Sequence, residues 1–251
     1  MRPILWILGF LGISALPAAG HVCGYYDVQG AYGMQLWGTT SIGVEGPQPL
    51  ASIGRLVFGE DGGVTGLASV DLAGYFLGNP VTGTYTFTTR CSLTFELRDQ
   101  SGGVEHFRGL ATPGGATVRI QQTDPDTGET GVLERTAASC GDASFQGAWS
   151  FTLSGTASQF DTQEAPGSSF SLRGTVFSDG QGNLVLQSAG GKTTGSYSVG
   201  SDCVAEMELG VVEGDSAGIL KLRGVLVEGG KVMLAAESDP ARIATARFTR
   251  R

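Results

Sequence analysis

Residues 83–98 read GTYTFTTRCSLTFELR, and residues 195–209 read GSYSVGSDCVAEMEL. Each stretch places a tyrosine six residues before a cysteine, and apolar and polar side chains then alternate. In the first, Leu93, Phe95 and Leu97 alternate with polar residues. A period of two is typical of a β-strand with one face buried and the other in water. The two stretches therefore predict the same strand pair, with a cysteine between the strands, at two places in the chain.

The likeness extends over both halves of the chain. The matched pairs are Cys23-Gly24 with Cys140-Gly141, Gln29-Gly30-Ala31-Tyr32 with Gln146-Gly147-Ala148-Trp149, Gly54-Arg55-Leu56-Val57-Phe58 with Arg173-Gly174-Thr175-Val176-Phe177, and Gln122-Thr123-Asp124-Pro125 with Glu237-Ser238-Asp239-Pro240. In this alignment Arg173 stands where the first half has Gly54. Markers in one order at nearly one spacing predict a duplication with units of about 115 residues.

The duplication selects one disulfide pairing. Four cysteines allow three pairings, and sequence alone does not usually choose among them. Because duplicated folds keep duplicated bridges, we predict the disulfides Cys23–Cys91 and Cys140–Cys203, one in each half.

Each half is predicted to form eight short strands separated by turns rich in Gly, Asp and Asn, with no helical periodicity. An eight-stranded meander loses its exposed edges when it closes on itself. We therefore predict an all-β fold of two tandem eight-stranded antiparallel up-and-down, lipocalin-like barrels, each with one disulfide. The expected strands are 30–38, 50–59, 63–71, 80–88, 90–98, 103–111, 115–123 and 129–136, and then 146–155, 168–178, 182–189, 192–199, 202–213, 216–228, 230–238 and 241–249.

The predicted disulfide closes one end of each barrel, because the residues before the first strand can reach across the barrel mouth to the fifth strand. The opposite end would carry the longest loops, Gly38–Pro49 and Gly155–Gly167. Such a shape is suited to hold a small ligand, although eight strands also permit a barrel filled by its own side chains.

The first residues, MRPILWILGFLGISALPAAG, indicate a secretory signal peptide over 1–20. The apolar run is too short for a membrane span, and no later stretch is long enough. We expect the domains 21–137 and 138–251, in a secreted, periplasmic or cell-surface protein whose cysteines oxidise. A formal net charge of −8 argues against nucleic acid as a partner. Glycine is 41 of 251 residues, and these are assigned to turns and strand bends.

The quoted pattern, with Gln-Gly-Ala-Tyr, Gly-Thr-Tyr-Thr-Phe and Thr-Asp-Pro, resembles uncharacterised exported bacterial proteins that carry cysteine-containing β-barrel repeats. The shape it implies is similar to barrels of the calycin or allene-oxide-cyclase type. The resemblance covers both halves, but its motifs are turns and strand cores, so it implies no functional residue.

No residue pattern points to catalysis, a cofactor or a metal. His106 has no evident triad partners, and we interpret it as a surface histidine. Asp124–Glu129 (DPDTGE) has some calcium-loop residues but fits a hairpin turn better. Gly191-Lys192-Thr193 lacks the first glycine of a phosphate loop.

Two further groups of residues have ordinary structural interpretations. Glu206 and Glu208 share a strand face that is predicted to be in solvent. The catalytic carboxylates of a glycosidase need a cleft, which this face is not expected to provide. The aromatic residues Trp37, Tyr85 and Trp149 are candidates for a pocket, although core packing is the more frequent role of strand aromatics.

The leading hypothesis is a secreted non-catalytic binding protein that holds a small apolar ligand in the barrel. The alternatives are a structural or surface-interaction module, in which two copies provide avidity, and a cyclase-type barrel enzyme, which needs an inward-facing acid or tyrosine. A sixteen-stranded outer-membrane barrel is a fourth alternative, disfavoured because the C-terminus Thr-Arg-Arg lacks a final aromatic residue.

Overall fold

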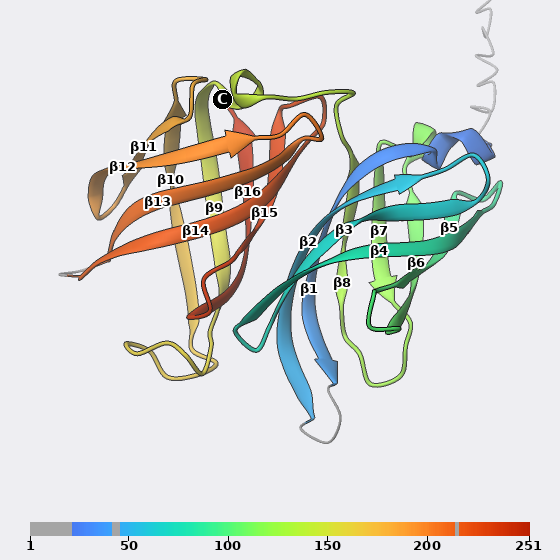
Figure 1. Ribbon diagram of the computed structural model, residues 1–251, viewed down its shortest axis with the longest axis horizontal. Coiled ribbons are helices and arrows are strands. Elements are labelled where there is room, and N and C mark those ends of the chain that lie inside the picture. Colours follow the sequence, from blue (N-terminus) through green and yellow to red (C-terminus); the bar gives the residue numbers. More distant parts are fainter. Residues whose placement is uncertain (1–21, 42–45, 214–215) are drawn as a thin grey trace, which may run out of the picture.

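The computed structural model describes residues 22–41, 46–213 and 216–251, which form two closed eight-stranded antiparallel barrels side by side (Figure 1). Strands that follow one another in sequence pair with one another, and the first strand of each barrel pairs with the last. The predicted all-β fold of two up-and-down barrels is confirmed. The first barrel consists of β1 (Gly30–Ser41), β2 (Pro47–Phe58), β3 (Gly63–Leu72), β4 (Tyr75–Phe87), β5 (Ser92–Arg98), β6 (Val104–Ala111), β7 (Thr117–Gln122) and β8 (Thr130–Arg135).

The second barrel repeats this order. It consists of β9 (Gly147–Ala157), β10 (Ser169–Ser178), β11 (Asn183–Ser188), β12 (Gly191–Val199), β13 (Val204–Glu213), β14 (Ser216–Val227), β15 (Val232–Glu237) and β16 (Arg242–Arg250).

The prediction of a long loop over Gly38–Pro49 is wrong. The β1–β2 ladder continues to the pair Ser41–Pro47, so most of that stretch is strand. The other expected loop, Gly155–Gly167, survives in shortened form between β9 and β10, because β9 runs on to Ala157. The signal peptide predicted over 1–20 lies outside the described residues.

Both barrels are packed with their own side chains. Residues that alternate along each strand point inward, as Leu93, Phe95 and Leu97 do on β5. The interior of the first barrel also holds the aromatic rings of Phe58 and Phe107, and Phe58 makes edge-on contacts with its neighbours. The second interior is equally apolar, with Phe145, Trp149, Phe151, Met207 and Phe248 among its buried residues.

The disulfides form as predicted, Cys23–Cys91 and Cys140–Cys203. In each barrel a short 3-10 helix follows the first cysteine, η1 (Tyr25–Val28) or η3 (Asp142–Phe145). The last residue of each helix, Val28 or Phe145, is buried in the core of its barrel. The expected closure of one end by the disulfide-linked segment is therefore present in both barrels. Two disulfides indicate that the protein folds in a non-reducing compartment.

The strand register corrects one part of the repeat alignment. Gly54 pairs with Met34 on β1, and Gly174 pairs with Phe151 at the matching position on β9. Gly174, not Arg173, is therefore the counterpart of Gly54, and the second half keeps this glycine. A Cβ at Gly174 would lie 2.9 Å from the ring of Phe151, so glycine makes room for the neighbouring interior side chain.

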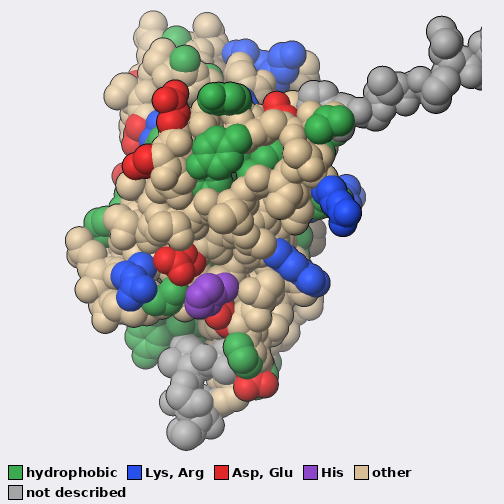
Figure 2. Space-filling model, turned by 90° about the vertical axis from the view of Figure 1, so that its right-hand side faces the viewer, with side chains coloured by type: hydrophobic (Ala, Val, Ile, Leu, Met, Phe, Trp, Pro, Cys, Tyr) green, Lys and Arg blue, Asp and Glu red, His purple; other side chains and the backbone are tan. Residues whose placement is uncertain are grey.

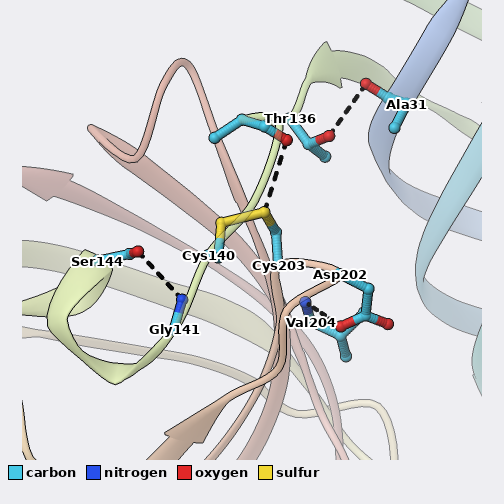
Figure 3. Close-up of a disulfide and its surroundings, with 9 residues drawn as sticks. Ala31, Thr136, Cys140, Gly141, Ser144, Asp202, Cys203 and Val204 are labelled. Atoms are coloured by element: carbon cyan, nitrogen blue, oxygen red, sulfur yellow. Dashed lines mark hydrogen bonds between the residues drawn. A yellow bond between two sulfur atoms is a disulfide. The ribbon is translucent and has the colours of Figure 1, made fainter.

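The segment between the barrels is fixed at both ends (Figure 3). At its start, the backbone N–H and the hydroxyl of Thr136 both donate to the carbonyl oxygen of Ala31 in the first barrel. At its far end, Cys140 is joined to Cys203 of the second barrel. In addition, Glu228 N–H donates to the carbonyl oxygen of Arg135. The connection is thus part of the packed structure and not a free tether.

The barrels pack through their outer faces. Ala51 and Ile53 of β2 lie in a buried apolar cluster with residues of β14, β15 and β16. The faces approach closely at Gly33, where an added Cβ would lie 2.6 Å from Cγ1 of Val227. At the rim, Arg247 donates to the Glu134 carboxylate at 2.8 Å. The buried members of the apolar cluster are Ala51, Ile53, Val225, Val227, Val232, Leu234, Ala236 and Ile243, and the partly buried Val132 and Val204 pack against them.

Gln35 makes two buried hydrogen bonds across the contact between the barrels. Its side-chain nitrogen donates to the carbonyl oxygens of Ala235 and Ala246 at 2.7 and 2.9 Å. We expect Gln35→Leu to lower the free energy of unfolding by about 2 kcal/mol, because it removes two buried hydrogen bonds. Urea unfolding measures the loss. Gln187→Leu, an exposed position on β11, is the control and should change stability by less than about 0.5 kcal/mol. Equal losses in both variants would mean that the bonds contribute nothing specific.

Candidate functional site

An apolar groove crosses the outer face of the first barrel over β1 and β5 to β8. Its volume is about 700 Å³. Trp37 at one side and Leu110 at the other are 44% and 64% exposed, and together they form part of one apolar surface. The other lining residues are Ser92, Arg108, Gly109, Arg119, Ile120, Gln121, Thr130, Gly131 and Val132.

The second barrel uses the matching surface to bind the first. Leu110 pairs with Ser92, one residue after Cys91, and Val225 pairs with Val204, one residue after Cys203. Leu110 and Val225 are therefore counterparts, but Val225 is only 2% exposed because the first barrel covers it. The groove of the first barrel therefore lies on a face whose counterpart in the second barrel is buried against the first barrel.

Two arginines give the groove a positive character in an otherwise acidic protein. Arg108 of β6 and Arg119 of β7 are both exposed and line it. One guanidinium nitrogen of Arg108 donates to Gln121 at 3.3 Å, which leaves further donors on the same group. In the second barrel Arg119 corresponds to Leu234, since each pairs with the counterpart residues Leu110 and Val225. The arginine is therefore specific to the uncovered face.

Of the three aromatic candidates, only Trp37 lies in the groove. Trp149 is completely buried in the second barrel, where its indole N–H donates to the Phe145 carbonyl oxygen. Tyr85 is buried in the first, and its hydroxyl donates to the carbonyl oxygen of Gly59. Burial and the neighbouring Tyr25 raise the pKa of Tyr85 above its ordinary value, so it stays neutral.

His106 is on the surface, as expected, but it has a partner that sequence reasoning did not find. Its Nδ1 lies 2.7 Å from Asp124 Oδ1, and its backbone N–H donates to Asp124 Oδ2. Burial opposes ionisation of Asp124, but these two contacts outweigh it and lower the pKa of the carboxyl. Figure 2 shows a histidine beside acidic and basic side chains on the open surface of the first barrel. The pair holds the β7–β8 turn against β6.

Residues Asp124–Glu129 form the turn between β7 and β8, as expected, but Glu129 then points into the barrel and is 1% exposed. Burial, reinforced by the charge of Glu105, raises the pKa of Glu129 to about 8. Within the described residues, no group of three or more His, Cys, Asp or Glu side chains is placed to hold a metal ion.

The remaining sequence candidates lie in regular strands. Gly191-Lys192-Thr193 begins β12 and forms no loop. Glu206 and Glu208 are exposed on β13, and Glu208 lies 3.6 Å from the Lys221 ammonium group. They line an open pocket between the barrels, to which Phe76 of the first barrel also contributes.

None of the helices in the described part of the chain is long and apolar enough to cross a membrane. The chain matches no protein-family model. A search of curated proteins likewise gave no match.

Proposed function

We propose that the chain is an exported, non-catalytic binding protein that takes a small apolar ligand with an anionic group in the groove of the first barrel. The observation that carries this proposal is an exposed tryptophan and leucine, Trp37 and Leu110, at the two sides of one groove of about 700 Å³. Ligand pockets commonly have volumes of about 300–1,000 Å³ and are lined by apolar side chains with a few polar groups.

The charge of the ligand follows from the polar residues of the groove. Arg108 and Arg119 line it, and arginine readily binds carboxylate, sulfonate or phosphate groups in a bidentate manner. The side chains that fill both barrel interiors favour this outer surface over the expected site inside the barrel. Export is supported by the leader-like residues 1–20 and by the two disulfides.

The test uses two dyes that differ in charge, 8-anilinonaphthalene-1-sulfonate and neutral N-phenyl-1-naphthylamine. We expect both to bind the purified protein at one site per chain and to shift the emission of Trp37. Leu110→Asp should weaken both affinities at least about tenfold, which corresponds to about 1.4 kcal/mol. The double variant Arg108→Gln/Arg119→Gln should weaken the sulfonate alone.

Phe177→Ser is the matched control, since Phe177 is 45% exposed on β10, away from the groove. It should leave both affinities unchanged. Unchanged binding in Leu110→Asp, or an equal loss in Phe177→Ser, would show that the dyes bind elsewhere and would contradict the proposal.

A surface-interaction module is the second candidate, because the counterpart of this face in the second barrel binds a protein surface, the first barrel. This function predicts that wild-type chains associate with one another through the groove face of the first barrel. Light scattering at increasing concentration would then give a mass above that of one chain, and Leu110→Asp would restore the monomer. A cyclase-type enzyme has less support, because apolar side chains fill most of the barrel interior, although Glu129 points into it at one end.

A further inference from the structure

Four neighbouring strands of the first barrel each direct one oxygen-bearing side chain inward at the same end. Gln122 of β7 and Glu129, which leads into β8, lie opposite each other, since the Gln122 N–H donates to the Glu129 carbonyl oxygen. Glu105 of β6 pairs with the inward-facing Leu97, and so points inward as well. On β1, the hydroxyl of Thr40 hydrogen-bonds to the Glu129 carboxylate. Neighbours at this spacing on a sheet have Cβ atoms about 5–8 Å apart.

Two of these groups are buried with an oxygen that has no partner. Glu129 is 1% exposed and Gln122 is 6% exposed. The Oε1 atom of each is buried without a hydrogen bond. Leaving a buried acceptor unsatisfied costs free energy, so such atoms in a native protein generally have a partner, which can be water or an ion.

Neither carboxyl group of the site faces a basic partner in the part of the chain that the structure describes. No ion pair with Lys or Arg involves either glutamate among the described residues.

The second barrel handles the same position differently. The strand pair Gln121–Thr130 in the first barrel matches the pair Ala236–Thr245 in the second. Gln122 follows Gln121 and Glu237 follows Ala236, so Glu237 is the counterpart of Gln122. The same register gives Ala244 as the counterpart of Glu129. Glu237 and Arg242 both line a small cavity of about 170 Å³, so this end of the second barrel includes a basic residue. The counterpart of Arg242 in the first barrel is Thr127, which is neutral.

We propose that the end of the first barrel binds a divalent cation of the calcium type through Glu105, Gln122, Glu129 and Thr40. Two carboxylates, an amide oxygen and a hydroxyl are hard oxygen ligands of the kind that Ca²⁺ prefers, and two carboxylates balance its charge. The set has only two acidic ligands, so water completes the coordination. Glu105 is partly exposed and leaves the ion a route to solvent.

The intact disulfide-bonded protein is first treated with EDTA, and the EDTA is then removed. Thermal unfolding with and without CaCl₂ and calorimetric titration with CaCl₂, both at pH 7.5, then measure binding. Extracellular calcium sites have dissociation constants of about 0.1–1 mM, so 10 mM Ca²⁺ should raise Tm by about 3–6 °C. Glu129→Gln should abolish the shift and the heat of binding. KCl at equal ionic strength should produce no shift.

Glu96→Gln is the matched control, because Glu96 is on the outer face of the neighbouring β5. It should keep the full response to Ca²⁺. Binding should also release protons, so the heat should depend on the ionisation enthalpy of the buffer, and the Tm shift should shrink at pH 5. No calcium-dependent shift in the wild type, or the same shift in Glu129→Gln, would overturn the proposal. Because Glu129→Gln leaves the outer groove intact, dye binding in this variant remains a separate test.

Discussion

The double variant Cys23→Ser/Cys91→Ser is expected to lose about 4 kcal/mol of unfolding free energy. The disulfide closes a loop with a sequence separation of 68 residues, and removing it enlarges the conformational freedom of the unfolded chain. The folded state is also affected, because Cys23 leads directly into η1, whose residue Val28 is buried against the core. Guanidinium unfolding, followed by far-UV circular dichroism, measures the loss.

The second barrel provides the matched comparison. Cys140–Cys203 closes a separation of 63 residues, so Cys140→Ser/Cys203→Ser should cost nearly the same. The barrels share a buried interface, and destabilising either one should therefore weaken the other. A loss below about 1 kcal/mol in both variants would mean that the core holds the closed ends without the disulfides.

A second large effect is expected at Asp71, whose substitution by Asn should make the protein more stable at pH 8. Asp71 is 0% exposed on β3, with Oδ2 lacking a hydrogen bond. Its Oδ1 accepts the N–H of Gly74, at the hairpin that abuts Pro240 of the second barrel. Burial raises the pKa of Asp71 to about 7, the Gly74 hydrogen bond lowers it, and the nearby Asp239 carboxylate raises it further.

The direction of the pH dependence follows from this raised pKa. In the unfolded chain Asp71 titrates near 3.8, so between that pH and 7 the folded state holds a proton that the unfolded state has lost. Stability is therefore greatest below pH 4 for this group and is lost as pH rises through 7. Between pH 5 and pH 8 the loss is about 2–3 kcal/mol.

Urea unfolding in EDTA at pH 5 and at pH 8 tests this, with Asp71→Asn expected to remove that part of the pH dependence. Glu60→Gln, at an exposed turn, is the control and should follow the wild type. Identical pH profiles for Asp71→Asn and the wild type would show that Asp71 is charged in the folded protein throughout this range.

The sequence was enough to predict the barrels and their disulfides because both depend on local repeats. Alternation at Leu93, Phe95 and Leu97 follows from the two-residue period of a strand, and duplicated cysteines imply duplicated bridges. The packing of one barrel on the other was not predicted, although a signal was present. All six residues of Val232–Glu237 are buried, and the run VMLAA has no polar face. A strand of this kind is covered on both sides.

The candidate groove was less predictable, because its residues come from separate strands. Trp37, Leu110 and the two arginines become neighbours only when β1, β8, β7 and β6 are laid side by side. Single apolar residues on an outer face are ordinary in sequence and carry no pattern. The inward turn of Glu129 was also missed, because the hairpin residues Asp124–Glu129 do not reveal where the next strand resumes its alternation.

The way the barrels pack has a consequence for self-assembly. The contact joins two different surfaces, and a contact of that kind can be repeated without end if every unit carries both surfaces. The second barrel does not repeat the β1–β2 face with which the first barrel packs against it. By strand register, Arg173 is the counterpart of Ile53, and Thr152 is the counterpart of Gln35. A third barrel would have to bury a guanidinium group where the first buries isoleucine. The divergence of the two copies at these positions therefore disfavours repeating this contact from one barrel to the next.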